Sequence, residues 1–487
     1  MINQNNKKEK TVLHSGATHS DLKNRAGGLA RGLSNRHIQL IAIGGTIGTS
    51  LFVGLSHVLA TAGPSAMFIY IIAGLTFFFA MRLLGEILLS NSHYKTFRDA
   101  AEDILGPRWG FTLGWMYMLF WIFSCAQDAL GVSTYINFWF PDVPYWQISV
   151  ILLLIVLVIN LIAVKAFGEL EFWFAIIKVV AIVVIAVVCL AFVVIGFKFA
   201  DGSTPDITNI WSHGGLFPNG FSGFINAIQI AFLAYAGIEL VGSAAAETKD
   251  PGKTLPKAIN SLPIRISFFY VVPVILLVII SPWDSYQQNF SPFVQIFTLA
   301  GIGIAAGIMN FVLLTAAASG ANSGIYASSR MLFGMSVSEE MPEKFSWTSK
   351  HSVPAFAVAF CGVSSAVLIF ILMLIAPTAH EGYLIASGIA SPCFLVSWLI
   401  IIASYLKFRK KFPEKHENSK FKAPAGIIMS FVIAAILIFC FVVTFFDKDA
   451  RIGACLIFVW FALVQIGFTY LEKKNPKLDE DIEDLYL

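Results

Sequence analysis

The sequence predicts an all-α integral membrane protein with about twelve transmembrane helices. Of its 487 residues, 57% are hydrophobic and only 13% are charged, whereas about 25% of the residues in an average soluble protein are charged. The mean hydropathy is +0.75. Apolar stretches long enough to cross a hydrocarbon core of roughly 30 Å are expected at 37–60, 65–89, 109–138, 145–164, 170–197, 221–246, 259–281, 293–325, 355–376, 383–405, 425–446 and 450–471.

The distribution of lysine and arginine residues sets the orientation of this topology. With the N-terminus in the cytoplasm, the opposite side receives only Lys198, Lys448 and Arg451. The cytoplasmic side receives Lys23, Arg25, Arg31, Arg36, Lys95, Arg98, Arg108, Lys165, Lys249, Lys253, Lys257, Arg330, Lys344, Lys350 and the run from Lys407 to Lys422. This asymmetry is the positive-inside pattern. We therefore expect a multi-pass protein of the cell (cytoplasmic) membrane, surrounded by the lipid bilayer, with both termini in the cytoplasm.

The predicted spans divide the chain into five parts. Residues 1–35 are polar and lack the apolar core of a signal peptide, so we expect a disordered cytoplasmic tail. Residues 36–198 and 220–406 contain five expected helices each, and residues 424–472 contain helices 11 and 12. Residues 473–487 are expected to form an acidic cytoplasmic tail.

Several kinds of chemistry are not expected from this chain. It has no phosphate-binding loop with a Gly-Lys-Ser signature, which argues against transport driven by ATP. Its cysteines lie in apolar segments without metal-ligand spacing, so we expect buried, inert thiols. They are Cys125, Cys189, Cys361, Cys393, Cys440 and Cys455. We expect no enzyme activity, no cofactor, no bound metal, no nucleic-acid partner and no obligatory protein partner.

Two of the predicted spans are interrupted near their middle. The stretch 38–59 contains Gly44-Gly45-Thr46-Ile47-Gly48, and the stretch 221–246 contains Tyr235-Ala236-Gly237-Ile238-Glu239. In lipid, unwound backbone is tolerated only where it is buried in protein or lines a cavity. Two such interruptions at corresponding places in two halves of a chain indicate the binding site of a transporter. The alternative is that these glycines only allow close helix packing.

The backbone groups at these interruptions suit a zwitterionic α-amino acid. Free N–H groups at the start of the outer half-helix, at Ile47, Gly48 and Thr49, favour a carboxylate. Carbonyl groups that end the other half-helices, at Ile41 and Ile43 and at Ala234 and Tyr235, favour an ammonium group. The expected substrate-binding residues are Ile43, Gly44, Thr46, Ile47, Gly48, Thr49, Ala234, Tyr235, Gly237 and Ile238.

Three of the ionisable residues inside predicted spans are candidates for function. Lys178 is about nine residues beyond Glu169, hence roughly 13 Å deep, where a lysine costs about 2.5–3.5 kcal/mol. Asp128 lies on a polar stripe of its helix with Trp121, Ser124, Gly131 and Tyr135. Glu239 follows the second interruption directly. Each of the three either carries protons or has a structural role. The structural role of Lys178 would be to fix helix packing, and that of Asp128 and Glu239 would be to accept hydrogen bonds from exposed backbone N–H groups. Ser319 is expected at the depth of Lys178.

Several motifs resemble the amino acid transporter family of the amino acid–polyamine–organocation superfamily. They are Asn35 to Gly45 with Ile47-Gly48, Met81 to Glu86, Gly237 to Gly242, Ala246 to Pro251, Ala321 to Tyr326 and Ser329 to Gly334. The resemblance runs from about residue 30 to 470. Within this family, residues 165–174 and 259–266 are most similar to permeases for D-serine, D-alanine and glycine.

The resemblance implies a LeuT-like fold with two inverted five-helix repeats, at about 37–197 and 221–405, followed by two further helices at 425–471. It also implies proton-coupled uptake of amino acids. A lysine on the fifth helix of such permeases occupies the place of sodium in sodium-coupled relatives, and Lys178 matches it. We expect Lys178 to contact the first and eighth helices, with Ser319 as an acceptor, and to take part in proton coupling with Asp128 and Glu239.

We therefore predict a secondary transporter that imports small neutral amino acids, such as D-serine, D-alanine and glycine, by proton symport with alternating access. The same machine for another solute, such as GABA, proline or an aromatic amino acid, is the nearest alternative. An amino-acid sensor that signals without transport is a second alternative. An integral-membrane enzyme is a third, although no nucleophile–base or metal constellation occurs among the membrane-embedded polar residues.

Overall fold

The computed structural model describes residues 47–94, 96–162, 164–242, 250–287, 290–447 and 450–475, with the side chains of 164–166 left out. All regular elements in these ranges are helices. The first part contains α3 (Thr49–Phe52), α4 (Gly54–Ala62), η1 (Gly63–Ser65), α5 (Ala66–Ser90), α6 (Phe97–Leu105), α7 (Pro107–Asn137), α8 (Tyr145–Ile162) and α9 (Val164–Ile195). The predicted tail at 1–35 and residues 476–487 of the predicted acidic tail lie outside the described residues.

The second part of the chain contains more short elements. These are η2 (Ile207–Ile210), α10 (Gly220–Leu233), α12 (Pro251–Asn260), α13 (Leu262–Ile266), the π-helix η3 (Ser267–Val271), α14 (Val272–Ile280), η4 (Trp283–Ser285), α15 (Pro292–Leu299), α16 (Gly303–Val337), η5 (Glu343–Ser346), α17 (Ala355–Ile375), α18 (Ala379–Lys411), α19 (Pro413–Glu417), α20 (Gly426–Val443) and α21 (Arg451–Lys474).

Ten helical segments in the described residues are long and apolar enough to cross a membrane. One of them, Thr49–Ser90, covers two expected spans, because the chain turns at η1 without leaving a helical conformation. A further apolar helix, Gly220–Leu233, falls below the length of a full span. The chain is therefore a multi-span membrane protein, and the total of twelve helices stays a prediction.

The expected single span at 293–325 is wrong. The structure has two helices there, α15 and α16, separated at Ala300–Ile302. Gly301 has φ of +72°, a left-handed conformation that glycine adopts without strain. Since α16 continues to Val337, Arg330 lies within this helix and not in a loop, and its guanidinium group is 3.3 Å from the Tyr326 ring centroid.

A capping box, a glycine and a proline determine where α6 begins and ends and where α7 begins. Thr96 accepts a hydrogen bond from the Asp99 N–H, and the Asp99 side chain accepts one from the Thr96 N–H, which forms a capping box at the start of α6. Gly106, with φ of +106°, ends α6. Pro107 then occupies the first turn of α7, where its missing N–H costs nothing.

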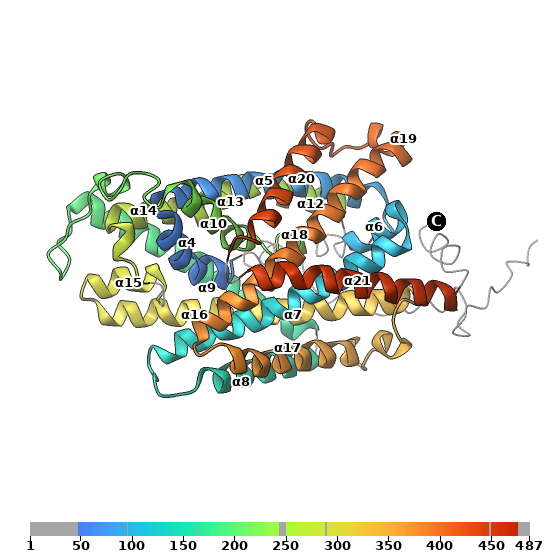
Figure 1. Cartoon of the computed structure of the whole chain (residues 1–487), viewed down its shortest axis with the longest axis horizontal. Coiled ribbons are helices and arrows are strands. Elements are labelled where there is room, and N and C mark those ends of the chain that lie inside the picture. Colours follow the sequence, from blue (N-terminus) through green and yellow to red (C-terminus); the bar gives the residue numbers. More distant parts are fainter. Residues whose placement is uncertain are drawn as a thin grey trace, which may run out of the picture.

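The centre of the molecule is the group of α7, α16 and α18. α7 packs along both of the others, and its span is 78% buried, as is that of α18. Figure 1 shows α7, α16 and α21 running along the long axis, with α8 and α17 together at one edge. The spans of α8 and α21 are only 28% buried, as expected for helices in contact with lipid. Cys455 on α21 is exposed, which corrects the expectation that all six cysteines are buried.

Small residues bring α7 and α16 into close contact. Gly324 lies against Cys125 and Trp121, and Gly320 lies against the Asp128 carboxylate. A β-carbon at Gly320 would meet that carboxylate. Small residues let membrane helices approach closely. Here they place the polar stripe of α7 directly against α16.

Candidate functional site

The structure describes the first predicted interruption only from Ile47 onward. Ile47 and Gly48 are not helical, and Gly48 is extended, with φ −115° and ψ −168°. α3 begins at Thr49. That this is the outer half of a broken helix stays a prediction. Ile47 is fully buried and Thr49 is 1% exposed. The expected site residues Ile43, Gly44 and Thr46 lie outside the described residues.

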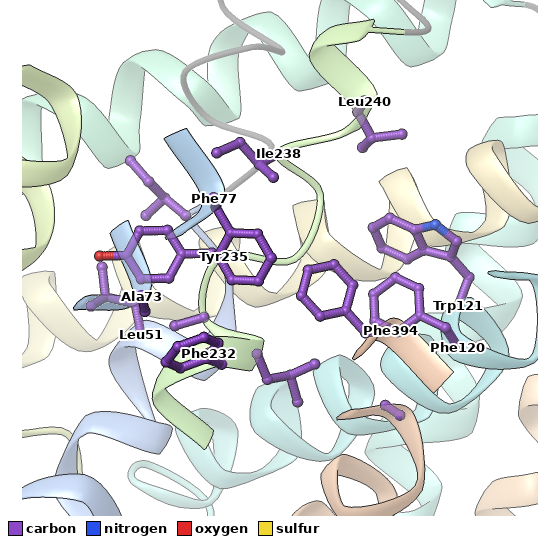
Figure 2. Close-up of a cluster of buried hydrophobic side chains, with 14 of the residues drawn as sticks. Leu51, Ala73, Phe77, Phe120, Trp121, Phe232, Tyr235, Ile238, Leu240 and Phe394 are labelled. Carbon is purple, nitrogen blue, oxygen red and sulfur yellow. The ribbon is translucent and has the colours of Figure 1, made fainter. Parts of the chain in front are cut away.

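The second interruption occupies residues 234–239. α10 ends at Leu233, and the backbone then forms turns with Tyr235 N–H to Phe232 O, Ala236 N–H to Leu233 O and Ile238 N–H to Tyr235 O, at 3.0–3.2 Å. These bonds span three residues, so the four-residue ladder of an α-helix is lost. Gly237 has φ of +88°. Figure 2 shows this loop passing Tyr235 and Ile238 before it reaches Leu240.

Tyr235 is part of an aromatic cluster at this interruption. Its hydroxyl donates a hydrogen bond to the Tyr70 carbonyl at 2.7 Å. Its ring stacks on Tyr270 at a centroid distance of 4.5 Å, and Phe77 lies on it at 5.8 Å. Ala234, whose carbonyl was expected to face an ammonium group, accepts a hydrogen bond from the Tyr270 hydroxyl at 3.1 Å. A carbonyl has two lone pairs, so this bond alone does not prevent it from accepting a second hydrogen bond.

The start of α3 and the second interruption are both hydrogen-bonded to α7. The Thr49 hydroxyl donates to Asp128 Oδ1 at 2.5 Å, and the Gln127 side-chain amide donates to the Ser50 hydroxyl at 3.0 Å. At the second interruption, the Tyr117 hydroxyl donates to Glu239 Oε1 at 2.9 Å. Asp128 and Glu239 are 5% and 1% exposed. The other residues of the predicted polar stripe on α7 are buried as well: Trp121, Ser124, Gly131 and Tyr135.

Lys178 lies in α9 and is 1% exposed. Its Nζ donates a hydrogen bond to Ser319 Oγ of α16 at 2.8 Å, so the structure brings these two predicted residues together. Ser319 in turn donates to Glu171 Oε2 at 2.7 Å. The Lys178 ammonium group interacts electrostatically with two carboxylates, those of Glu171 and Asp128. Asp128 therefore belongs to the surroundings of both Thr49 and Lys178.

Glu171 is the site residue that sequence reasoning missed. It is 1% exposed, and its Oε1 accepts a hydrogen bond from Asn322 Nδ2 at 2.8 Å. The Asn322 Oδ1 accepts one from Asn160 Nδ2 of α8 at 2.7 Å. Glu171 precedes Lys178 by seven residues, or two turns of helix, which puts both on the same face. That seven-residue spacing is the signal in the sequence that could have identified Glu171.

Comparison with known proteins identifies relatives along most of the chain. Residues 37–481 match the amino acid permease family. A D-serine/D-alanine/glycine transporter of Escherichia coli strain K12 is 44% identical over 450 residues, which cover 92% of this chain and 95% of the relative. The amino-acid permease AapA of Bacillus subtilis strain 168 is 41% identical, over 92% and 96% of the two chains. A probable threonine/serine transporter of the same strain, YbxG, is 37% identical over 90% and 94%.

Proposed function

This chain belongs to the amino acid permease family, and we propose that it imports small neutral amino acids together with protons. D-Serine, D-alanine and glycine are the proposed solutes. The name and the 44% identity of the Escherichia coli relative support this choice. The large side chains of Phe232, Tyr235 and Ile238 around the second interruption also favour solutes with small side chains.

One observation carries the proposal: the start of α3 and the interruption at 234–239 are both hydrogen-bonded to α7. Asp128 binds Thr49, and Tyr117, eleven residues earlier on α7, binds Glu239. Eleven residues correspond to roughly 16 Å along the helix. In our proposal, the solute lies beside this segment of α7. Its carboxylate binds the N–H groups at Gly48 and Thr49, and its ammonium group binds carbonyls of the loop 234–239.

Proton coupling is proposed for the ionisable groups around this segment. Lys178, Asp128 and Glu239 are buried, and a charged group at this depth is costly to keep without a function. The ammonium group of Lys178 lies between α9 and α16, where it donates a hydrogen bond to Ser319. We propose that this ammonium group makes sodium unnecessary and that its proton is exchanged during the transport cycle.

The architecture is proposed to be two inverted five-helix repeats, at 36–198 and 220–406, followed by helices 11 and 12 at 424–472. Family membership and the ten candidate spans support it. Both termini lie in the cytoplasm in this proposal, consistent with the placement of lysine and arginine residues. Transport proceeds by alternating access, as one group of helices rocks against the other around the two interruptions, and it requires no protein partner.

Uptake by the purified protein in proteoliposomes tests this function. Radiolabelled glycine is offered with an inward proton gradient, with an inward sodium gradient, or with neither. We expect accumulation only with the proton gradient, and competition by unlabelled D-serine and D-alanine. Accumulation driven by sodium alone would contradict proton symport. Binding of glycine without uptake under any gradient would favour a sensor.

A second solute class has support from one relative. The probable threonine/serine transporter of Bacillus subtilis is 37% identical over most of both chains. L-Serine and L-threonine therefore belong in the same competition series, with GABA and proline. Stronger competition by any of these than by D-alanine would reassign the solute and leave the transport mechanism unchanged.

A further inference from the structure

We propose that Glu171 is the proton acceptor that lies between Lys178 and the cytoplasm, and that the Ser319 hydroxyl carries the proton from one to the other. This inference rests on the proposed proton symport and adds a residue and a path to it. The path is a continuous set of hydrogen bonds from Lys178 Nζ to Ser319 Oγ, at 2.8 Å, and from Ser319 Oγ to Glu171 Oε2, at 2.7 Å.

The Val156 carbonyl determines which groups donate and which accept hydrogen bonds around Glu171. Asn160 Nδ2 donates to the Val156 carbonyl, which only accepts, and also to Asn322 Oδ1. The side-chain amide of Asn322 is thereby oriented with Nδ2 toward Glu171, where it donates to Oε1. Glu171 Oε1 must therefore remain an acceptor. A proton that binds Glu171 binds at Oε2, the oxygen that faces Ser319.

The transfer conserves protons and needs no other reactant. An N–H bond of the Lys178 ammonium group breaks and an O–H bond forms on Ser319, while the original Ser319 O–H bond breaks and an O–H bond forms on Glu171 Oε2. The electron pair of the broken N–H bond stays on Nζ. The products are a neutral amine, an unchanged hydroxyl and a neutral carboxylic acid, so the buried opposite charges disappear together, which lowers the cost of their burial.

The position of Glu171 gives the path its direction. It is seven residues closer than Lys178 to the start of α9, or roughly 10 Å along the helix, and that end of α9 is proposed to face the cytoplasm. α16 faces Glu171 with Ser319, Asn322 and Ser323, and α7 contributes Asp128, which interacts with both Lys178 and Glu171. Asp128 lies beside Thr49 at the proposed solute site.

Glu171→Gln tests the acceptor, because it keeps the shape of the side chain and removes its ability to bind and release a proton. Two measurements are compared in proteoliposomes: exchange of labelled for unlabelled glycine without a gradient, and accumulation driven by a proton gradient. We expect E171Q to retain exchange and lose gradient-driven accumulation, together with the acidification of the vesicle interior reported by a pH-sensitive dye. Full gradient-driven accumulation by E171Q would overturn the inference.

Ser319 provides the second variant pair, in case E171Q fails to fold. Ser319→Ala removes the bridging hydroxyl, whereas Ser319→Thr retains it. We expect S319A to lose gradient-driven accumulation but keep exchange, and S319T to restore accumulation. Loss of exchange in S319A together with loss of folding, as judged by thermal unfolding, would show a structural role and overturn the relay. If glycine accumulation by the wild-type protein did not depend on the proton gradient, the proposed symport itself would be refuted. Failure of the symport can therefore be distinguished from failure of the Glu171 relay.

Discussion

The hydroxyl of Thr49, the first residue of the outer half-helix, donates a hydrogen bond to the Asp128 carboxylate of α7. Both residues are buried, and 79 positions separate them in the sequence. The Thr49 methyl group packs on Gly131, one turn further along α7. This contact fixes where α3 begins relative to the polar stripe of α7.

Thr49→Val is expected to destabilise this region by about 1–3 kcal/mol, because it leaves a buried acceptor without its donor. Thr49→Ser keeps the hydroxyl and is the matched control. We expect a lower thermal unfolding midpoint and a higher KM for glycine in T49V than in T49S. Equal values for the two variants would show that the hydrogen bond to Asp128 has no role in placing the half-helix.

Gly237→Ala tests the second interruption. Gly237 has φ of +88°, and the left-handed region costs an L-residue roughly 1–2 kcal/mol. We expect G237A to lower transport strongly, since the loop 234–239 would have to change its path. Gly334→Ala is the control, because Gly334 lies within α16 with open space around it and alanine favours helices. A G237A protein with wild-type uptake would contradict a functional role for this backbone conformation.

Lys178→Met tests the proposed coupling cation. Methionine fills a similar space without the ammonium group, so we expect accumulation to lose its dependence on the proton gradient while exchange of glycine persists. Lys198→Met, in the exposed segment after α9, is the control for removing a lysine. If K178M kept the full dependence on the proton gradient, Lys178 would be a packing residue only.

Glu340, which lies outside the membrane spans, is expected to make the stability of the folded protein depend on pH. Arg98 is buried and binds both Glu102, at 2.6 Å, and Glu340, at 2.5 Å. Burial raises the pKa of Glu340 well above its ordinary value; the positive charge of Arg98 opposes this effect, and the negative charge of Glu102 adds to it. Because the folded state holds the proton more tightly than the unfolded state, this group contributes stability at pH below its unfolded pKa of about 4.3 and loses it as pH rises through the folded pKa.

The measurement is the thermal unfolding midpoint as a function of pH. We expect the midpoint of the wild-type protein to fall with rising pH more steeply than that of Glu340→Gln, in which no proton is exchanged at this position. Glu343→Gln, at an exposed glutamate three residues away, should follow the wild-type profile. Identical profiles for wild type and E340Q would contradict a raised pKa of Glu340 in the folded protein.

The features that the sequence predicted are those set by local pattern. Apolar length located most of the spans, and Gly237 marked the interruption at 234–239, because unwound backbone inside a membrane needs unusual local chemistry. The first interruption stays a prediction, since residues 37–46 lie outside the described residues. The break at Gly301 was missed because apolar residues continue on both sides of Gly301-Ile302-Gly303. A glycine within a membrane helix can equally serve close packing, so its φ is known only from the structure.

Contacts between residues far apart in the chain could not be predicted from the sequence. The buried cluster of Arg98 and Glu340 joins residues 242 positions apart, and no spacing rule relates them. Glu171 is an intermediate case, since the seven-residue spacing to Lys178 is visible in the sequence. Its bonds to Ser319 and Asn322, however, depend on how α9 packs on α16.

The central claim is that the two interruptions together hold a zwitterionic amino acid beside α7. A structure of the protein with bound glycine or D-serine tests it most directly. We predict the carboxylate at the N–H groups of Gly48 and Thr49 and the ammonium group at carbonyls of residues 234–237. A solute bound elsewhere, or a continuous α-helix through either interruption in the bound protein, would contradict the claim.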